Sequence, residues 1–279
     1  MDSDSLTMAS SNLQLVAYCN VAVVAVLTYD TLLNINEEYE HIWKPRRSII
    51  KWLYLWTRYS TFIDTTLAVH MRTHIDVNQA NCRVLTIFDR IFSIVGIVVT
   101  EVILTLRTYA LYGQSKRLLG CLLIMWFAIG GVNLWAMVKW ATSLAEVTGS
   151  PLNLCNLDSS TNAGLACYSS LLVGETVIVL LTVWKGLHTF SLSRSAYRHS
   201  RLVITFYRDG ILFYLAMLLI LVVDVSLESQ APPGQKFVAD VPLRAMQSIL
   251  ACHLVIHARE VAFRDLHEEV DETMLDTLQ

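Results

Sequence analysis

Residues 118–140 read LLGCLLIMWFAIGGVNLWAMVKW, and the single charge in this stretch is Lys139. A helix needs about 20 mostly apolar residues to cross a bilayer, because each residue rises by about 1.5 Å. Residues 118–140 exceed that length. They predict a membrane-spanning helix.

Six further stretches of the chain have the same apolar character. They are Leu13–Leu33, Ile49–Met71, Val84–Leu106, Gly164–Trp184, Phe206–Val225 and Val241–Ile256. The last is the shortest and contains Pro242 near its start. Together the stretches predict an all-α integral membrane bundle of seven helices formed by residues 1–257, followed by a tail of residues 258–279.

The overall composition supports a membrane protein. Hydrophobic residues make up 54% of the chain and charged residues 16%, compared with about 25% charged residues in a typical soluble domain. One soluble core could not cover that much apolar surface, so lipid is the expected solvent and the bilayer the expected partner. The acidic start, Met1–Ser5, lacks the basic region of a cleaved signal peptide. The first stretch is therefore expected to remain as an anchor.

The basic residues indicate which way the chain faces. If the N-terminus lies outside, 14 Lys and Arg residues fall on the cytosolic side and 4 on the outer side. Under the positive-inside rule this bias predicts an outside N-terminus and a cytosolic C-terminus. The basic cytosolic loop Lys185–Arg208 is a candidate site for anionic lipid or a cytosolic protein, although the topology rule alone also explains its charge.

Several ionisable residues fall within the apolar stretches, where charges are costly and usually face the bundle interior. Counting from the ends of the stretches puts Arg58 and Glu175 near mid-membrane. The same count puts Asp64 and Arg90 at one level nearer the outer surface. One interpretation is an outward polar cavity that binds a ligand or relays protons; the other, which we favour, is a set of interhelical ion pairs. Asp30 is a competing partner for Arg58.

Three cysteines are predicted on the outer side, where oxidation is permitted. They are Cys82, Cys155 and Cys167. One disulfide is expected to hold the long outer loop, and all three pairings remain open.

Two histidines near the end of the last stretch, His253 and His257, have the i, i+4 spacing that places both imidazoles on one helix face. Seven-span zinc hydrolases of the alkaline ceramidase and adiponectin-receptor group carry a similar pair. A zinc site also needs a third protein ligand at the same depth, and none is evident. No metal, no cofactor and no catalysis are expected.

The tail carries one apolar stripe at helical spacing. Its members are Phe263, Leu266, Val270, Met274 and Leu278. The other face is mainly acidic, and anionic lipid would repel it. The tail is expected to pack against the basic loops or a protein partner, or to be disordered.

The predicted topology resembles that of G-protein-coupled receptors. The third stretch, however, ends Leu106-Arg107-Thr108-Tyr109, without the acidic residue that precedes arginine in those receptors. The last stretch also lacks their Asn-Pro-x-x-Tyr motif and the lysine that holds retinal in rhodopsins. The likeness concerns architecture, and architecture does not establish function.

A second resemblance is carried by short motifs spread along the chain. They are Tyr29-Asp30-Thr31-Leu32-Leu33, Ile42-Trp43-Lys44, Leu53-Tyr54-Leu55, Arg58-Tyr59, Leu106–Gly113 and Leu254–Glu260. With them the chain resembles multi-pass membrane proteins of mushroom-forming fungi whose N-terminal region, here residues 18–62, is domain of unknown function 6533. The resemblance implies a fungal integral membrane protein and assigns no activity.

These observations predict a membrane protein in the plasma membrane or another membrane of the secretory pathway. The leading functional hypothesis is receptor-like sensing of a small ligand without catalysis. The alternatives are a secondary transporter or proton-coupled carrier that uses Arg58 and Glu175, and, less favoured, an intramembrane zinc hydrolase. No nucleic-acid partner is expected.

Overall fold

The computed structural model describes residues 3–45, 48–73, 79–146, 163–193, 201–230 and 240–277. Every regular element within these ranges is a helix. The long helices are α1 (Ser3–Leu33), α3 (Ile49–Thr73), α4 (Gln79–Leu111), α5 (Lys116–Glu146), α6 (Ala163–Ser193), α7 (Arg201–Gln230) and α8 (Asp240–Thr277). Each apolar stretch lies within one of these helices, which confirms the prediction of an all-α fold.

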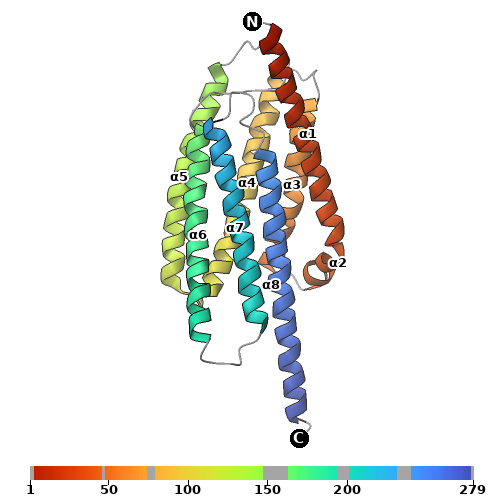
Figure 1. Cartoon of the computed structure of the whole chain (residues 1–279), viewed down its shortest axis with the longest axis vertical. Coiled ribbons are helices and arrows are strands. Elements are labelled where there is room, and N and C mark those ends of the chain that lie inside the picture. The colour runs from red at the N-terminus through yellow and green to blue at the C-terminus, as the bar shows by residue number, and fades with distance from the viewer. Residues whose placement is uncertain are drawn as a thin grey trace.

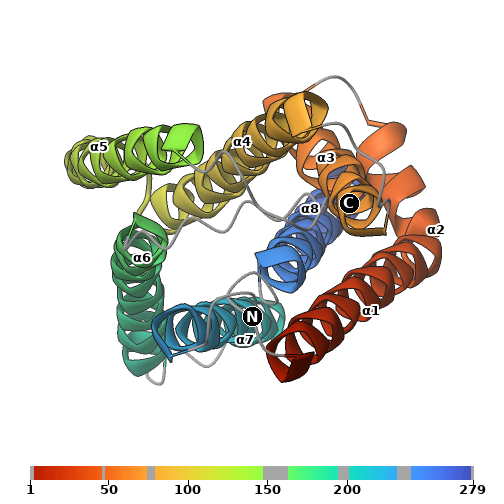
Figure 2. The same ribbon diagram turned by 90° about the horizontal axis from the view of Figure 1, so that it is seen from above.

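The long helices alternate in direction, and α8 lies at the centre of the bundle. We call the end at which α1 begins the upper end, as drawn in Figure 1. Seen from above, α8 lies inside a ring formed by the other long helices (Figure 2), and it packs against α1, α3, α4 and α7. In its apolar segment 56% of residues are buried, compared with 17% in α1 and in α5. α8 therefore faces mainly other helices.

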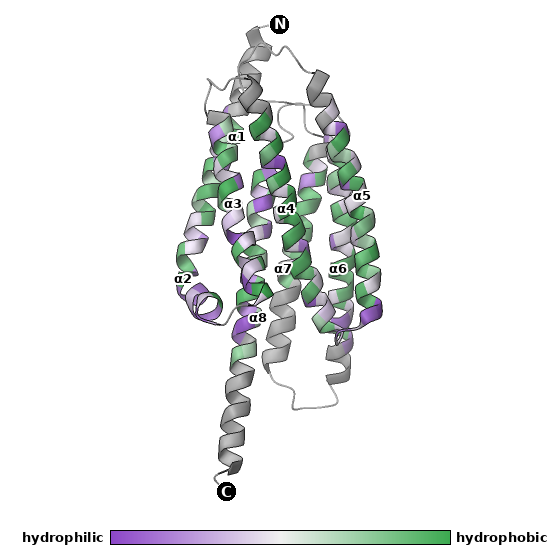
Figure 3. Ribbon diagram, turned by 180° about the vertical axis from the view of Figure 1, so that it is seen from behind, coloured by the Kyte–Doolittle hydropathy of each residue, from purple (hydrophilic) through white to green (hydrophobic). Residues whose placement is uncertain are grey.

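Four helices in the described part of the chain are long and apolar enough to cross a membrane. Their apolar segments are Gln14–Leu33, Lys116–Trp140, Gly164–His188 and Asp240–Glu260, and a shorter apolar segment covers Tyr214–Leu227. Large apolar side chains are exposed, including Phe127, which is 78% exposed. Hydrophobic residues colour much of α5 green in Figure 3. Lipid is the solvent that suits such a surface. The chain is a membrane protein.

Two short elements connect α1 to α3 at the lower end. α2 (Ile35–Glu38) is followed directly by a π-helix, η1 (Tyr39–Trp43), in which the Lys44 N–H donates to the Tyr39 carbonyl at 3.0 Å. Single π-turns often occur at functional sites. Here they reverse the chain and place the buried Glu38 side chain against α3.

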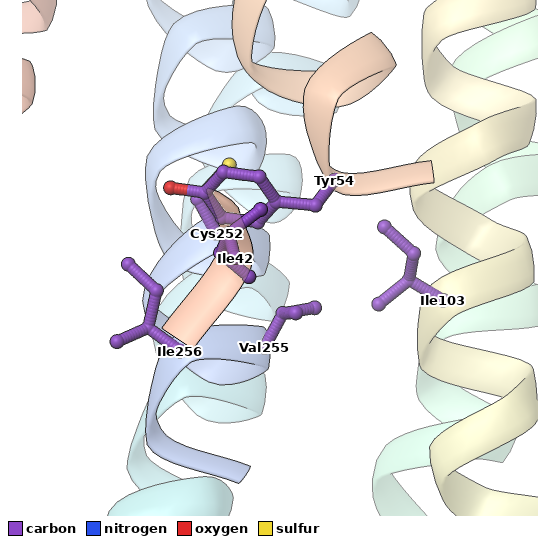
Figure 4. Close-up of a cluster of buried hydrophobic side chains, with 6 residues drawn as sticks. All are labelled: Ile42, Tyr54, Ile103, Cys252, Val255 and Ile256. Carbon is purple, nitrogen blue, oxygen red and sulfur yellow. The ribbon is translucent and has the colours of Figure 1, made fainter. Parts of the chain in front are cut away.

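A buried cluster joins side chains from four elements. It contains Ile42 from η1, Tyr54 from α3, Ile103 from α4, and Cys252, Val255 and Ile256 from α8 (Figure 4). In lipid there is little hydrophobic driving force between helices, so close packing of such side chains is an important source of stability. The cluster anchors this segment of α8 to its neighbours.

Hydroxyl side chains within the helices bond mostly to their own backbone. Examples are Thr61, Thr65, Thr108 and Thr182, whose hydroxyls donate to the carbonyl four residues earlier at 2.6–3.0 Å. Such bonds satisfy the hydroxyl without a partner helix. The polar contacts between helices are therefore made by other residues, chiefly charged ones.

A glycine ends α4 and sets the tight turn to α5. Gly113 has φ of +63° and Gln114 has φ of +59°. The Gln114 N–H donates to the Tyr109 carbonyl at 3.1 Å, and the Gly113 N–H donates to the Ala110 carbonyl at 3.1 Å. This pair of bonds is the Schellman motif, in which glycine is favoured because it has no Cβ.

Candidate functional site

Polar side chains form three clusters along α8, and each cluster ties α8 to neighbouring helices. The upper cluster consists of Arg90 on α4, Tyr168 on α6 and Asp240 on α8. The Arg90 Nη1 lies 2.7 Å from Asp240 Oδ2, and the Tyr168 hydroxyl donates to Asp240. The Arg90 guanidinium also lies 6.0 Å from the Trp140 ring centroid, a cation–π contact with α5. The first residue of α8 thus holds three elements together.

The middle cluster is an ion pair between α3 and α8 in the bundle interior. The Arg244 Nε lies 3.1 Å from Asp64 Oδ2, and the side chains are 4% and 3% exposed. The Arg244 Nη2 donates to Ser60 Oγ at 3.1 Å, and the Ser93 hydroxyl of α4 donates to Asp64 Oδ2 at 3.3 Å. Hydrogen bonds of this kind reduce the cost of burying both charges.

One turn further along α8, a neutral contact continues the series. The Ser248 hydroxyl donates to the backbone carbonyl of Thr57 at 2.8 Å. The polar residues Asp240, Arg244 and Ser248 are four apart, so they lie along one face of α8. This face follows α3 from the upper cluster toward the lower end.

The lower cluster consists of Asp30, Asn34, Glu38, Arg58 and His253. Asp30 is its central acceptor. Its Oδ2 lies 2.7 Å from Arg58 Nη1, and its Oδ1 lies 2.7 Å from His253 Nε2 and 3.2 Å from Asn34 Nδ2. Charge-assisted bonds from three donors fix this carboxylate between α1, α3 and α8.

Glu38 joins the π-helix to the same cluster. Its Oε1 accepts hydrogen bonds from the Tyr59 hydroxyl at 3.0 Å and from the Trp43 indole N–H at 3.2 Å. Its Oε2 lies 3.9 Å from Arg58 Nε. With Asp30 and Glu38 charged, the cluster carries two negative charges against one on Arg58.

Two carboxyl groups meet elsewhere in the bundle, and we call Glu101 on α4 and Glu175 on α6 the acidic pair. They are 4% and 1% exposed, and each is within hydrogen-bonding reach of the other. None of their four oxygens has a donor among the described residues. Two like charges about 4 Å apart repel by about 4 kcal/mol at an effective dielectric constant of about 20. Burial and mutual repulsion therefore make the doubly charged pair unfavourable without a counter-ion.

The structure pairs the predicted intramembrane charges differently from the depth count. Arg58 contacts Asp30 and not Glu175, which faces Glu101. Asp64 contacts Arg244, and Arg90 contacts Asp240, so these two residues of similar depth do not meet. Depths counted along straight helices ignore the direction in which a long side chain points, and Arg58 reaches down toward Asp30.

The predicted histidine pair does not converge on a third ligand. His253 binds Asp30, and the Nδ1 of His257 lies 3.6 Å from Glu260 Oε2, one turn further along α8. In the described residues no group of three His, Cys, Asp or Glu side chains is placed to hold a metal ion. The two histidines therefore have different acidic neighbours.

Of the predicted disulfide candidates, the structure describes one thiol. Cys167 is a free cysteine on α6. Cys155 and the side chain of Cys82 lie outside the described residues, so a bond between these two stays a prediction.

Sequence reasoning missed the roles of Glu38 and Asp240. A signal for Asp240 was present: with Arg244 and Ser248 it forms a polar face at four-residue spacing in an apolar helix. The sequence held no comparable signal for Glu38, because this residue lies in a connection between two apolar stretches, and such connections are expected to be exposed to solvent. Its burial follows from the π-turn, which periodicity does not reveal.

Comparison with known families gives one match. Residues 18–63 match a family described as "Family of unknown function (DUF6533)", in agreement with the resemblance noted for residues 18–62. The matched region spans the lower part of α1, α2, η1 and the first half of α3. It supplies four of the five residues of the lower cluster, and α8 supplies His253. Searches of curated proteins and of solved structures returned no match.

Proposed function

We propose that the chain is a receptor-like, multi-pass membrane protein of fungal origin that senses a small ligand at its upper end and signals through α8. All seven long helices cross the membrane in this proposal, in the plasma membrane or another membrane of the secretory pathway. The upper end faces outside and the lower end faces the cytosol. No catalytic step is involved.

The orientation rests on the distribution of Lys and Arg. In the sequence, the segments between the apolar stretches that are assigned to the lower side, together with the tail, hold 14 of these residues, whereas the segments assigned to the upper side hold 4. Such a bias is expected when the lower end is cytosolic. The basic lower connections then offer a surface for anionic lipid or a cytosolic signalling protein.

The observation that carries the proposal is the path of α8. This one helix begins at the ion pair with Arg90, passes the interior pair with Asp64, and reaches Asp30 at the lower end. It then continues without a break to Thr277, beyond the rest of the bundle (Figure 1). A rotation or shift of α8 would change all three clusters together, which is the behaviour expected of a two-state element.

On the side proposed to face outside, the upper cluster is easier for a ligand to reach than the interior ion pair. The side chains of Arg90 and Asp240 are 29% and 13% exposed, whereas those of Asp64 and Arg244 are almost fully buried. A small molecule with a carboxylate or an ammonium group would compete for this ion pair and release the start of α8. The ligand class that fits is therefore a small charged molecule.

Coupling between the two ends is the central test. In the full-length protein in nanodiscs, Asp240→Asn should change hydrogen–deuterium exchange of residues 30–43, at the opposite end. Lys139→Gln, which removes an exposed charge at the upper end, should leave that exchange unchanged. Unchanged exchange in Asp240→Asn would exclude transmission through α8.

The topology can be tested with glycosylation acceptors, because the chain has no Asn-x-Ser/Thr sequence of its own. Asp158→Ser creates one at Asn156, in the connection before α6, and should lead to glycosylation in microsomes. Asp271→Asn creates one in the tail and should remain unmodified. The reverse pattern would invert the proposed orientation.

A second candidate function is a proton-coupled carrier, and the acidic pair favours it. Buried carboxyl groups without a basic partner are typical of proton relays in transporters. In proteoliposomes loaded with a pH-sensitive dye, a carrier would pass protons down an imposed gradient, and Glu175→Gln would abolish that flux. A receptor would show no flux in either form.

A further inference from the structure

The acidic pair, Glu101 and Glu175, lies in an apolar part of the bundle. One turn from each carboxyl, Leu104 and Ile178 belong to the same buried cluster, together with Val179, Met217 and Leu254. Water is excluded from both side chains, which are more than nine-tenths buried. Carboxylates in such surroundings need hydrogen bonds or opposite charges, because burial removes their hydration.

The described residues supply the acidic pair with neither a hydrogen-bond donor nor an opposite charge. None of the four carboxyl oxygens accepts a hydrogen bond from a protein donor. In the described part of the chain, the groups that interact electrostatically with these carboxyls are the other carboxyl and the Tyr214 hydroxyl, which is not a basic partner.

The polar groups on the packed elements around the pair are engaged elsewhere. The Tyr214 hydroxyl on α7 donates to the Leu104 carbonyl at 3.4 Å. The Arg107 guanidinium on α4 lies 5.9 Å from the Tyr214 ring centroid. On α5, the Trp126 indole donates to Thr105 Oγ1 at 2.9 Å.

We propose that Glu101 and Glu175 together bind one monovalent cation, either a proton or a sodium ion, between α4 and α6. A shared proton would form a short, charge-assisted O–H···O bond between the two carboxyl groups. A sodium ion would be held by carboxylate oxygens, the ligands that hard cations prefer. Either cation removes the repulsion between the helices, so its binding stabilises the contact of α4 with α6.

The site does not depend on the proposed receptor function, because it lies outside the three clusters along α8. It would equally serve a carrier, as the group that takes up the coupling ion. A substitution in α8 that abolishes signalling should not change cation binding by Glu101 and Glu175. A substitution in the acidic pair that abolishes cation binding should not change the contacts of α8. The two proposals can fail separately.

The test uses the full-length protein in nanodiscs and two measurements. Infrared spectroscopy detects the C=O stretch of a buried protonated carboxyl. Thermal unfolding compares sodium chloride with choline chloride at equal ionic strength. The variants are Glu101→Gln, Glu175→Gln and the double change, with Glu37→Gln as the control because Glu37 is exposed. The double variant should fold, since two buried amides can hydrogen bond to each other.

A protonated-carboxyl band that disappears in the double variant and persists in Glu37→Gln identifies the proton. A Tm that rises with sodium but not choline, and loses this dependence in either single variant, identifies sodium. The proposal is overturned if the wild-type protein shows neither signal. It is also overturned if the signals survive the double change.

Discussion

Gly96 of α4 lies directly against the guanidinium of Arg244 on α8. A Cβ built on Gly96 would come within 1.9 Å of Arg244 Nη2 and 2.6 Å of its Cζ. The absence of a side chain at this one position lets the guanidinium pass the α4 backbone and reach Asp64. A glycine on one helix thus makes room for an ion pair between two others.

Gly96→Ala should therefore break the middle cluster. Because Arg244 must move and leave Asp64 buried without its partner, we expect a loss of about 3 kcal/mol in the free energy of unfolding. Unfolding in mixed micelles measures this change. Gly131→Ala is the control, since a Cβ there meets nothing within 4 Å. It should be neutral or stabilise α5 by up to about 1 kcal/mol. Equal effects of the two substitutions would refute the role of Gly96.

Arg58 should be energetically coupled to Asp30 and not to Glu175. A double-mutant cycle of Arg58→Leu with Asp30→Asn should give an interaction energy of more than about 1 kcal/mol, because the two side chains share a hydrogen bond. The cycle of Arg58→Leu with Glu175→Gln should be additive within about 0.5 kcal/mol. Both values come from unfolding free energies of the single and double variants. Coupling to Glu175 alone would restore the pairing inferred from depth.

Tyr168→Phe should weaken the upper cluster while the aromatic ring still fills the space of the tyrosine ring. The substitution removes only the hydroxyl that donates to Asp240. We expect a loss of about 1–3 kcal/mol, the usual range for a hydrogen bond to a charged group. Thermal unfolding provides the measurement. Tyr18→Phe, at an exposed position on α1, is the matched control and should leave the Tm unchanged. A Tyr168→Phe protein as stable as wild type would show that Arg90 alone holds Asp240.

Gly113→Ala should destabilise the end of α4. An alanine with φ near +60° costs about 1 kcal/mol relative to glycine, and the Schellman bonds of Gly113 and Gln114 require that conformation. Gly120→Ala, at a position inside α5 with open space around it, should show no such loss. The comparison needs only the Tm of each variant. A Tm of Gly113→Ala at or above the wild-type value would contradict the turn geometry.

The helices of this fold could be predicted from the sequence, because an apolar stretch long enough to cross a membrane has few alternatives to a helix. Their arrangement could not. The central position of α8 depends on which helix faces pack and form polar contacts with one another. The apolar stretch that forms α8 was also the shortest of the seven, so it did not stand out in the sequence. Predicted depths were too coarse to pair the charges, since an arginine side chain spans more than a helical turn. Asp64 and Arg244 are 180 residues apart, and no local pattern connects them.

The central position of α8 has a consequence for biogenesis. Among the described helices α8 is synthesised last, so Asp30, Asp64 and Arg90 are made before their partners on α8 exist. Arg58 and Asp30 can form their ion pair as soon as α1 and α3 have been made. Asp64 and Arg90 cannot form theirs until Arg244 and Asp240 have been synthesised. Until then Asp64 and Arg90 lack these partners, and unpaired charges are costly in an apolar environment. Arrival of the final helix neutralises these charges and completes assembly.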